Sequence, residues 1–301
     1  MQLKPFVLAL SLSFVAGPAL AQDADPQVTG GAPAARQGNE VKVELIDAGA
    51  SPQRELRYNV EAPVASAIAS EMNTSTNIPA MGMNMAMPAI LQTMDIDAKT
   101  EGELIHVESI VRKAELGSTQ GANPMMVEPM RESVRQMIGS KSVMQITNRG
   151  HVKSMTIDGA QDMGMGMGAD QISQYVVLPE EAVGVGAKWR TVQDIDSGIK
   201  MKVTSTYTLT KVDGNNIEVD VEYTFEGGQQ ALPDQGMGAA QLEKLDGRGR
   251  AKITLNLRTL AQRAESNMRM QMSMNSDFGP MEIEQTVGTK VTPADRADSD
   301  N

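Results

Sequence analysis

The chain has 301 residues, which is long enough for one large β domain or two smaller ones, each with its own hydrophobic core. It contains no cysteine, which excludes disulfides, thiol nucleophiles and lipid attachment through cysteine. The formal net charge of −11 disfavours nucleic acids and anionic membrane surfaces as partners.

The first residues predict a signal peptide. Lys4 supplies a basic region, residues 6–15 an apolar one, and Ala19-Leu20-Ala21 a cleavage site of small residues. We therefore expect a mature protein that begins at Gln22 and is periplasmic or secreted. No later segment approaches the ~20 apolar residues of a membrane-spanning helix, so no transmembrane segment is expected.

Changes in composition divide the rest of the chain. Residues 22–40 are rich in Ala, Gly, Pro and Gln without periodicity, which predicts a disordered leader. The expected divisions after it are a first β half over 41–160 with a helix near 124–138, a Met/Gly-rich joint with a short helix over 161–178, a second β half over 179–292, and a charged tail over 293–301.

Alternation of apolar and polar residues is the main signal for strands. It is clearest over residues 201–209 and 217–225, where one face is apolar and the other polar. Residues 56–60 also read as a strand, whereas residues 227–247 read as a long polar loop. The expected fold class is mainly β, with two similar antiparallel curved sheets or half-barrels and one or two short helices.

Two segments carry a resemblance to a known family. Residues 44–58 resemble an L-x-x-G-x-x-P-x-x-x-L-R-Y opening, with Ile46 in place of its first leucine, and Pro179 to Trp189 fit a mid-chain P-x-x-x-V-x-x-G-x-x-W segment. In these motifs the chain resembles an uncharacterised family of exported, β-rich bacterial proteins, a domain of unknown function. The resemblance covers residues 41–292 and implies no activity or catalytic residue.

The sequence is rich in methionine, and two segments repeat it at every second position. Side chains two apart on a strand lie on one face, about 7 Å apart along the chain. Thioether sulfur is a soft ligand for Cu(I) or Ag(I), but methionine also fills cores that contain few aromatics. Core packing and a copper site therefore both remain possible roles for these repeats. We call the repeats the two methionine ladders, and they consist of Met81, Met83, Met85 and Met87, and of Met268, Met270, Met272 and Met274.

Other chemistry has little support in the sequence. His106 and His151 lack the spacing of a zinc site, and no serine lies in a G-x-S-x-G elbow. The acidic residues between Asp95 and Glu103 read as a solvated strand end. No catalytic residue and no cofactor is expected, copper being the alternative, and the chain is not expected to be an enzyme.

The sequence therefore predicts an exported, non-catalytic protein of unknown role. A sheet face lined by Met, Val, Ile and Leu suits an apolar small molecule or a lipid, although an ordinary filled core explains the same residues. The alternative function is a periplasmic Cu(I)/Ag(I)-binding protein that uses the methionine ladders.

Overall fold

The computed structural model describes residues 36–37, 41–120, 122, 124–158, 175–196, 199–232, 240–276 and 279–296. The described elements, in chain order, are β1 (Arg36–Gln37), β2 (Val41–Asp47), β3 (Val64–Ile78), the 3-10 helix η1 (Pro79–Met81), β4 (Met83–Ala86), β5 (Ile90–Glu101), β6 (Leu104–Leu116), α1 (Pro124–Gln136), β7 (Lys141–Thr147), β8 (Val152–Asp158), β9 (Lys188–Asp196), β10 (Lys200–Asp213), β11 (Asn216–Gly227), β12 (Gln230–Ala231), β13 (Gln241–Asn256), β14 (Gln262–Ser276) and β15 (Gly279–Ala294).

The strands form one antiparallel sheet in the order β1-β8-β7-β6-β5-β3-β15-β14-β13-β11-β10-β9-β2, with β4 on β3 and β12 on β13. The expected mainly antiparallel β fold is confirmed, and the two halves are continuous because β3 pairs with β15. Arg36 and Gln37 fall within the predicted disordered leader, yet they pair with β8. That part of the leader prediction is wrong, because the edge of β8 offers backbone groups for pairing.

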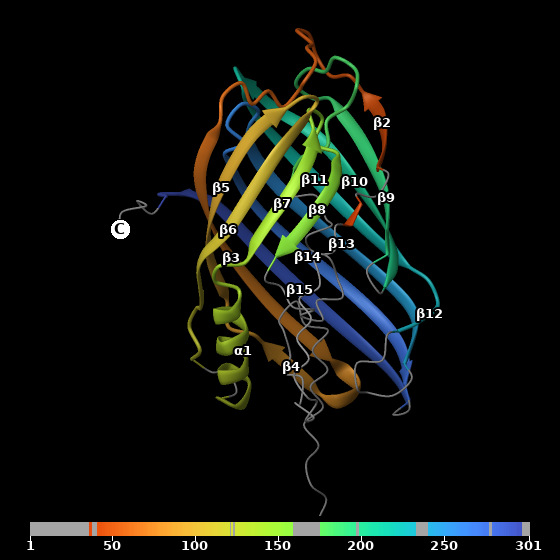
Figure 1. Cartoon of the computed structure of the whole chain (residues 1–301). Coiled ribbons are helices and arrows are strands. Elements are labelled where there is room, and N and C mark those ends of the chain that lie inside the picture. Colours follow the sequence, from red (N-terminus) through yellow and green to blue (C-terminus); the bar gives the residue numbers. More distant parts are fainter. Residues whose placement is uncertain are drawn as a thin grey trace, which may run out of the picture.

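The sheet curls so that the strands of its two halves face each other across a common interior, as Figure 1 shows. Alternate residues of each strand point inward, and the largest apolar cluster draws on both halves, from Ile105 and Ile146 to Leu209 and Val219. We call this cluster the upper core, since it lies at the end that carries residues 48–60. A strongly twisted sheet of this length buries more apolar surface when it curls than when it stays open.

Two irregular segments close the upper end. Residues 175–178 are fully buried in the upper core, and the Leu178 amide donates to the Arg149 carbonyl in the β7–β8 turn. Trp189 follows at the start of β9, where its indole donates to the Val177 carbonyl at 2.7 Å and stacks on Tyr207. This tryptophan is fully buried and anchors the start of β9 in the core.

The expected strand at residues 56–60 is wrong, although the segment is extended. Its backbone bonds reach two separate turns, since the Tyr58 amide donates to the Asn148 carbonyl and the Asn59 amide to the Leu257 carbonyl. The Tyr58 hydroxyl donates to the Val176 carbonyl at 2.9 Å, which joins the two closing segments. An alternating pattern cannot distinguish a strand from an extended segment that fills the end of a curled sheet.

The polar loop predicted over residues 227–247 is also only partly present, because β13 begins at Gln241. Gly247 and Gly249 lie on the inward face of β13, opposite Phe225 and Tyr223. A Cβ atom on Gly249 would lie 2.9 Å from the Asn267 carbonyl oxygen, so only glycine lets β14 approach this closely. The glycines therefore mark a close approach of neighbouring backbones within a strand rather than a loop.

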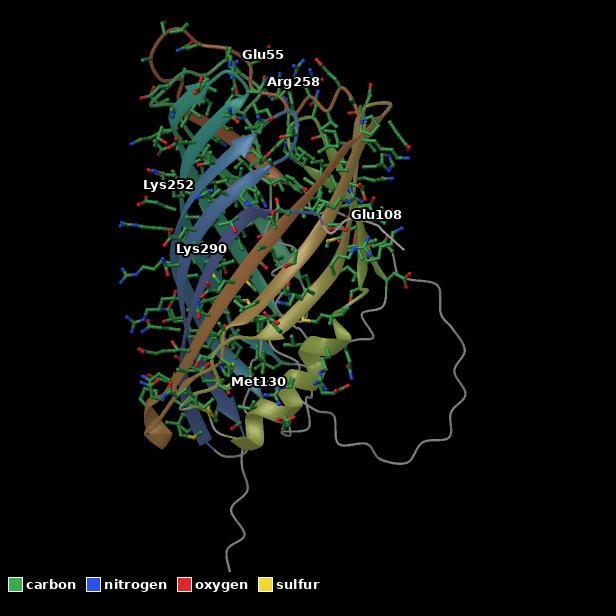
Figure 2. All side chains as sticks on the ribbon, turned by 90° about the vertical axis from the view of Figure 1, so that its left-hand side faces the viewer. Glu55, Glu108, Met130, Lys252, Arg258 and Lys290 are labelled. Atoms are coloured by element: carbon green, nitrogen blue, oxygen red, sulfur yellow. The ribbon has the colours of Figure 1, made fainter. Side chains whose placement is uncertain are left out.

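The lower end contains a second core and the helix. The lower core includes Met272, Met274, Met281 and Phe225. Helix α1 buries Met130 and Val134 against Ile90 and Ala114, and Figure 2 shows it at the lower end of the sheet. The helix predicted near 124–138 is thus present, and it ends at Gln136, just before Gly139 with its positive φ of 86°.

The remaining divisions of the chain are only partly visible. The signal peptide, most of the leader, the last two residues of the first half, and residues 161–174 of the joint with its predicted short helix lie outside the described residues. Strand β15 extends to Ala294, two residues into the predicted charged tail. None of the described helices is long and apolar enough to cross a membrane.

Candidate functional site

Between the upper and lower cores, one row of residues crosses the inner face of the sheet. Strand pairing places its members side by side from β9 to β3. We call it the waist row, and it consists of Thr191, Ser205, Tyr223, Gly249, Met268, Val287 and Thr74. Compared with both cores it contains small and hydroxyl-bearing residues, so it fills less of the interior.

Two inward-pointing side chains of this row remain partly exposed. Tyr223 and Met268 pack against core clusters, but neither is fully buried, whereas Phe225 and Met270 beside them are. They are neighbours across Gly249, which has no side chain to separate them. In the next row toward the upper end, Met72, Ser266 and Thr289 are also partly exposed. Solvent-accessible space therefore lies along this part of the inner face.

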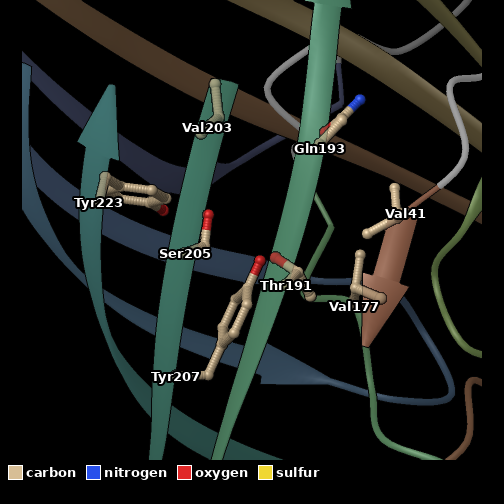
Figure 3. Close-up of a pocket in the computed structure, with 8 residues that line it drawn as sticks. All are labelled: Val41, Val177, Thr191, Gln193, Val203, Ser205, Tyr207 and Tyr223. Carbon is tan, nitrogen blue, oxygen red and sulfur yellow. The ribbon is translucent and has the colours of Figure 1, made fainter. Parts of the chain in front are cut away.

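A small pocket opens at the β9–β10–β11 end of the waist row (Figure 3). Its volume is about 20 Å³, which is room for roughly one water molecule. All its lining residues are uncharged, and they are Val41, Val177, Thr191, Gln193, Val203, Ser205, Tyr207 and Tyr223.

The polar groups of the pocket differ in their hydrogen bonds. The Tyr207 hydroxyl bonds to Thr191 and Ser205, and Figure 3 shows the Tyr207 and Thr191 oxygens turned toward each other. The Gln193 amide and the Tyr223 hydroxyl have no hydrogen-bond partner among the described residues. The pocket therefore contains two unused, uncharged hydrogen-bonding groups.

The tyrosines of this region stay protonated at neutral pH. Burial raises the pKa of Tyr223 above its ordinary value, and the neighbouring Tyr207 adds to the shift. Burial also raises the pKa of Tyr207, although its bonds to Thr191 and Ser205 act in the opposite direction. A phenol held neutral in this way serves as a hydrogen-bonding group and not as a base.

The structure places the methionines of β14 and two methionines of β4 on the same inward face. Met270, Met272 and Met274 are buried on β14, and Met268 is partly buried, which follows the alternation in the sequence. Met83 and Met85 point inward from β4, Met87 follows β4, and Met81 lies in η1.

The two ladders are separated by two strands. Met270 lies beside Gln285 of β15, which lies beside Thr76 of β3 and then Met85 of β4. Three steps between strands amount to roughly 14 Å along a sheet. The packing of Met83 in the lower core, together with Met272 and Met274, brings part of both ladders into one apolar cluster.

The other residues considered from the sequence lie away from the waist row. His106 is near Glu101, with 3.4 Å between the imidazole Nε2 and a carboxylate oxygen. His151 lies elsewhere, and burial lowers the pKa of its imidazole. Asp95 was expected to be solvated but is buried, with the Arg112 guanidinium 2.7 Å from its carboxylate. Across the residues that the structure describes, no group of three or more His, Cys, Asp or Glu side chains could hold a metal ion.

Sequence reasoning missed Gln193 and Tyr223 as site residues. Tyr223 was read only as an inward position of its strand, and Gln193 stands among polar residues with no motif around it. The signal in the sequence that could have pointed to them is the absence of charged residues at alternate positions of successive strands. This signal can be interpreted only when it is known which strands pair.

Comparison with known proteins adds one family. Residues 169–259 match the model of a family of unknown function, DUF6263. The expected resemblance to an uncharacterised family is thereby confirmed, and the match includes the Pro179 to Trp189 segment but not the opening motif. No curated protein matches the chain.

Among solved structures, the chain is similar to a protein of unknown function from the DUF3598 family of Nostoc punctiforme PCC 73102. The two sequences are 11% identical, the alignment covers 74% of this chain and 94% of the other, and the TM-score is 0.09.

Proposed function

We propose that this is an exported, non-catalytic protein that binds an apolar small molecule or a lipid in the interior of its curled sheet. The observation that carries the proposal is the partial exposure of Tyr223 and Met268, which point inward between two buried cores. An interior built only for stability would fill this space, because protein cores pack to the density of organic crystals.

Methionine makes the interior adaptable. The pocket has room for one water molecule, so a larger ligand has to displace side chains. Met268 and Met72 are unbranched, and their thioethers rotate freely and fit irregular apolar shapes. Binding by rearrangement of such side chains needs little movement of the strands.

Export is supported by the sequence of residues 1–21, with its basic, apolar and small-residue regions.

A non-catalytic role is supported by the chemistry of the waist row. Its side chains are hydroxyls, thioethers and aliphatic groups, and the pKa values of Tyr207 and Tyr223 are raised away from neutrality.

A fluorescent probe tests the proposal. N-phenyl-1-naphthylamine is neutral and apolar, and its emission rises when it leaves water. We expect saturable binding to the mature chain and loss of that binding in Met268→Glu, which puts a charge on the inner face. The matched control is Asn267→Glu, which adds the same charge one residue away on the exposed face of β14.

The proposal requires the two variants to differ. Failure of the wild type to bind the probe contradicts it, and so does equal binding by both variants when circular dichroism shows both to be folded. Binding by Asn267→Glu alone supports the inner face as the site.

One observation favours a second candidate, a Cu(I)/Ag(I) site. Met274 lies directly opposite Met281, and both join Met272, Met201 and Met83 in the lower core. Soft thioether ligands suit these ions. The same residues pack against Phe225 and Leu245, however, and that arrangement suits a filled core equally well.

A further inference from the structure

We propose that the ligand has an uncharged polar end, of the hydroxyl, amide or ester class, which hydrogen-bonds to Tyr223 or Gln193 in the pocket while its apolar part lies along Met268. The inference rests on the proposed function, and it specifies the chemistry of the bound molecule.

The absence of charge on the inner face carries the first step. In strands β9, β10, β11, β13, β14, β15 and β3, the inward positions hold no Asp, Glu, Lys, Arg or His, and the same is true of the residues that line the pocket. The charges of these strands lie on the outer face, where Figure 2 shows Lys252 and Lys290. A carboxylate or an ammonium bound inside would lose its hydration without gaining a counter-ion.

The unused hydrogen-bonding groups carry the second step. The Tyr207 hydroxyl already bonds to Thr191 and to Ser205, whereas Gln193 and Tyr223 have no partner among the described residues. A glutamine amide has two donor hydrogens and an acceptor oxygen, and a phenol has one donor and an acceptor. Polar groups that face a pocket without partners gain most from a ligand that both donates and accepts.

The position of Gly249 carries the third step. It separates Tyr223 from Met268 in the waist row and contributes no side chain, so the two side chains lie on either side of it. A molecule with its polar end in the pocket can therefore extend its apolar part toward Met268 and Val287. Those residues offer a thioether and an aliphatic surface of low polarity.

Displacement of the bound naphthylamine probe by three molecules with the same alkyl chain tests the inference. They are decanol, decanoate and decylammonium, used below their micelle concentrations at about pH 7.5, where the last two are charged. We expect decanol to displace the probe at a concentration at least about tenfold lower than either ion, as follows from the cost of burying an unpaired charge.

Two variants separate hydrogen bonding from general hydrophobicity. Tyr223→Phe and Gln193→Leu each remove one unused polar group and keep the size of the side chain. Loss of the group that bonds the ligand should weaken decanol binding about fivefold more than it weakens probe binding, which is the usual effect of one neutral hydrogen bond. The control is Thr224→Val, which removes an exposed hydroxyl from the outer face of β11.

The possible results are distinguishable. If the probe does not bind the wild type, the proposed function fails and the inference fails with it. If the probe binds but either ion displaces it as well as decanol does, the inference alone is overturned. It is also overturned if both variants bind decanol like the wild type.

Discussion

At the scale of single residues, the close approach of β14 to β13 depends on a glycine. A Cβ atom on Gly249 would lie 2.9 Å from the Asn267 oxygen and 3.2 Å from the Met268 Cα. Gly249→Ala should therefore force the backbones of β13 and β14 apart and destabilise the protein by about 1–3 kcal/mol, as overpacking commonly does. Urea unfolding followed by Trp189 fluorescence measures the loss.

The control for this change is Gly228→Ala. No atom lies within 4 Å of a Cβ at Gly228, so this variant should unfold close to the wild-type midpoint. Equal stability of the two variants would show that β14 has room to move, and that glycine is not required for the approach of the two strands.

The methionine ladder of β14 gives a second prediction at this scale. Replacing Met268, Met270, Met272 and Met274 with Leu keeps the volume nearly constant, so each change should cost about 1.5 kcal/mol or less. We expect neither the wild type nor the variant to bind Cu(I) stoichiometrically in a competition titration under reducing conditions. Stoichiometric binding by the wild type that disappears in the variant would contradict the packing account and favour the metal site.

The inward direction of these methionines could be predicted from the sequence, because Glu265, Asn267, Arg269 and Gln271 occupy the alternate positions. The sequence could not predict that Gln193 and Tyr223 have no hydrogen-bond partner among the described residues. Whether Gln193 and Tyr223 are partnered depends on β9, β10 and β11 lying side by side, and a single sequence gives no information about that pairing.

At the scale of elements, the local sequence pattern predicts single strands, whereas contacts between distant parts of the chain decide how the strands pair. The alternation over residues 201–209 and 217–225 identified β10 and β11. The first part of β13 was missed because its glycines resemble a loop. The pairing of β3 with β15 joins residues about two hundred positions apart, and no local sequence pattern predicts it.

The junction of the two halves carries a pH-dependent contact. Arg296, just after β15, donates hydrogen bonds of 2.6 and 2.9 Å to Asp97 of β5, which hold the pKa of that carboxyl below its ordinary value. A lowered carboxyl pKa gives stability that is present above the unfolded value of about 3.9 and is lost as the pH falls through the folded value.

Arg296→Gln should therefore destabilise the protein slightly at neutral pH, since the pair is partly exposed, and the difference from wild type should vanish in strong acid. Thermal unfolding at a series of pH values measures it, with Lys290→Gln on the exposed face of β15 as control. A difference that persists unchanged at low pH would mean that Arg296 acts through packing and not through its charge.

At the scale of the whole molecule, an N-terminal stretch lies along the edges of the sheet and a mid-chain segment covers its upper end. Residue Gln37 pairs with β8 and Val41 with β9, so the same short stretch contacts both outer parts of the sheet. The mid-chain segment 175–190 crosses the upper end. The interior is thus enclosed by strands on its sides and by irregular chain above.

Export is a prediction for the whole chain. Protein purified from its own host should begin at Gln22, because the signal peptide is removed after Ala21. Mass spectrometry of the intact protein measures this directly. Recovery of a chain that still contains residues 1–21 would contradict export by cleavage.

The most direct measurement of the central claim is native mass spectrometry of the mature protein purified from its host without detergent, followed by organic extraction of the same sample. The account predicts a bound mass that is released by the extraction and identified as a neutral molecule with an apolar chain, and that is absent from folded Met268→Glu. A wild-type protein that carries only its own mass, and binds no apolar molecule added afterwards, would contradict it.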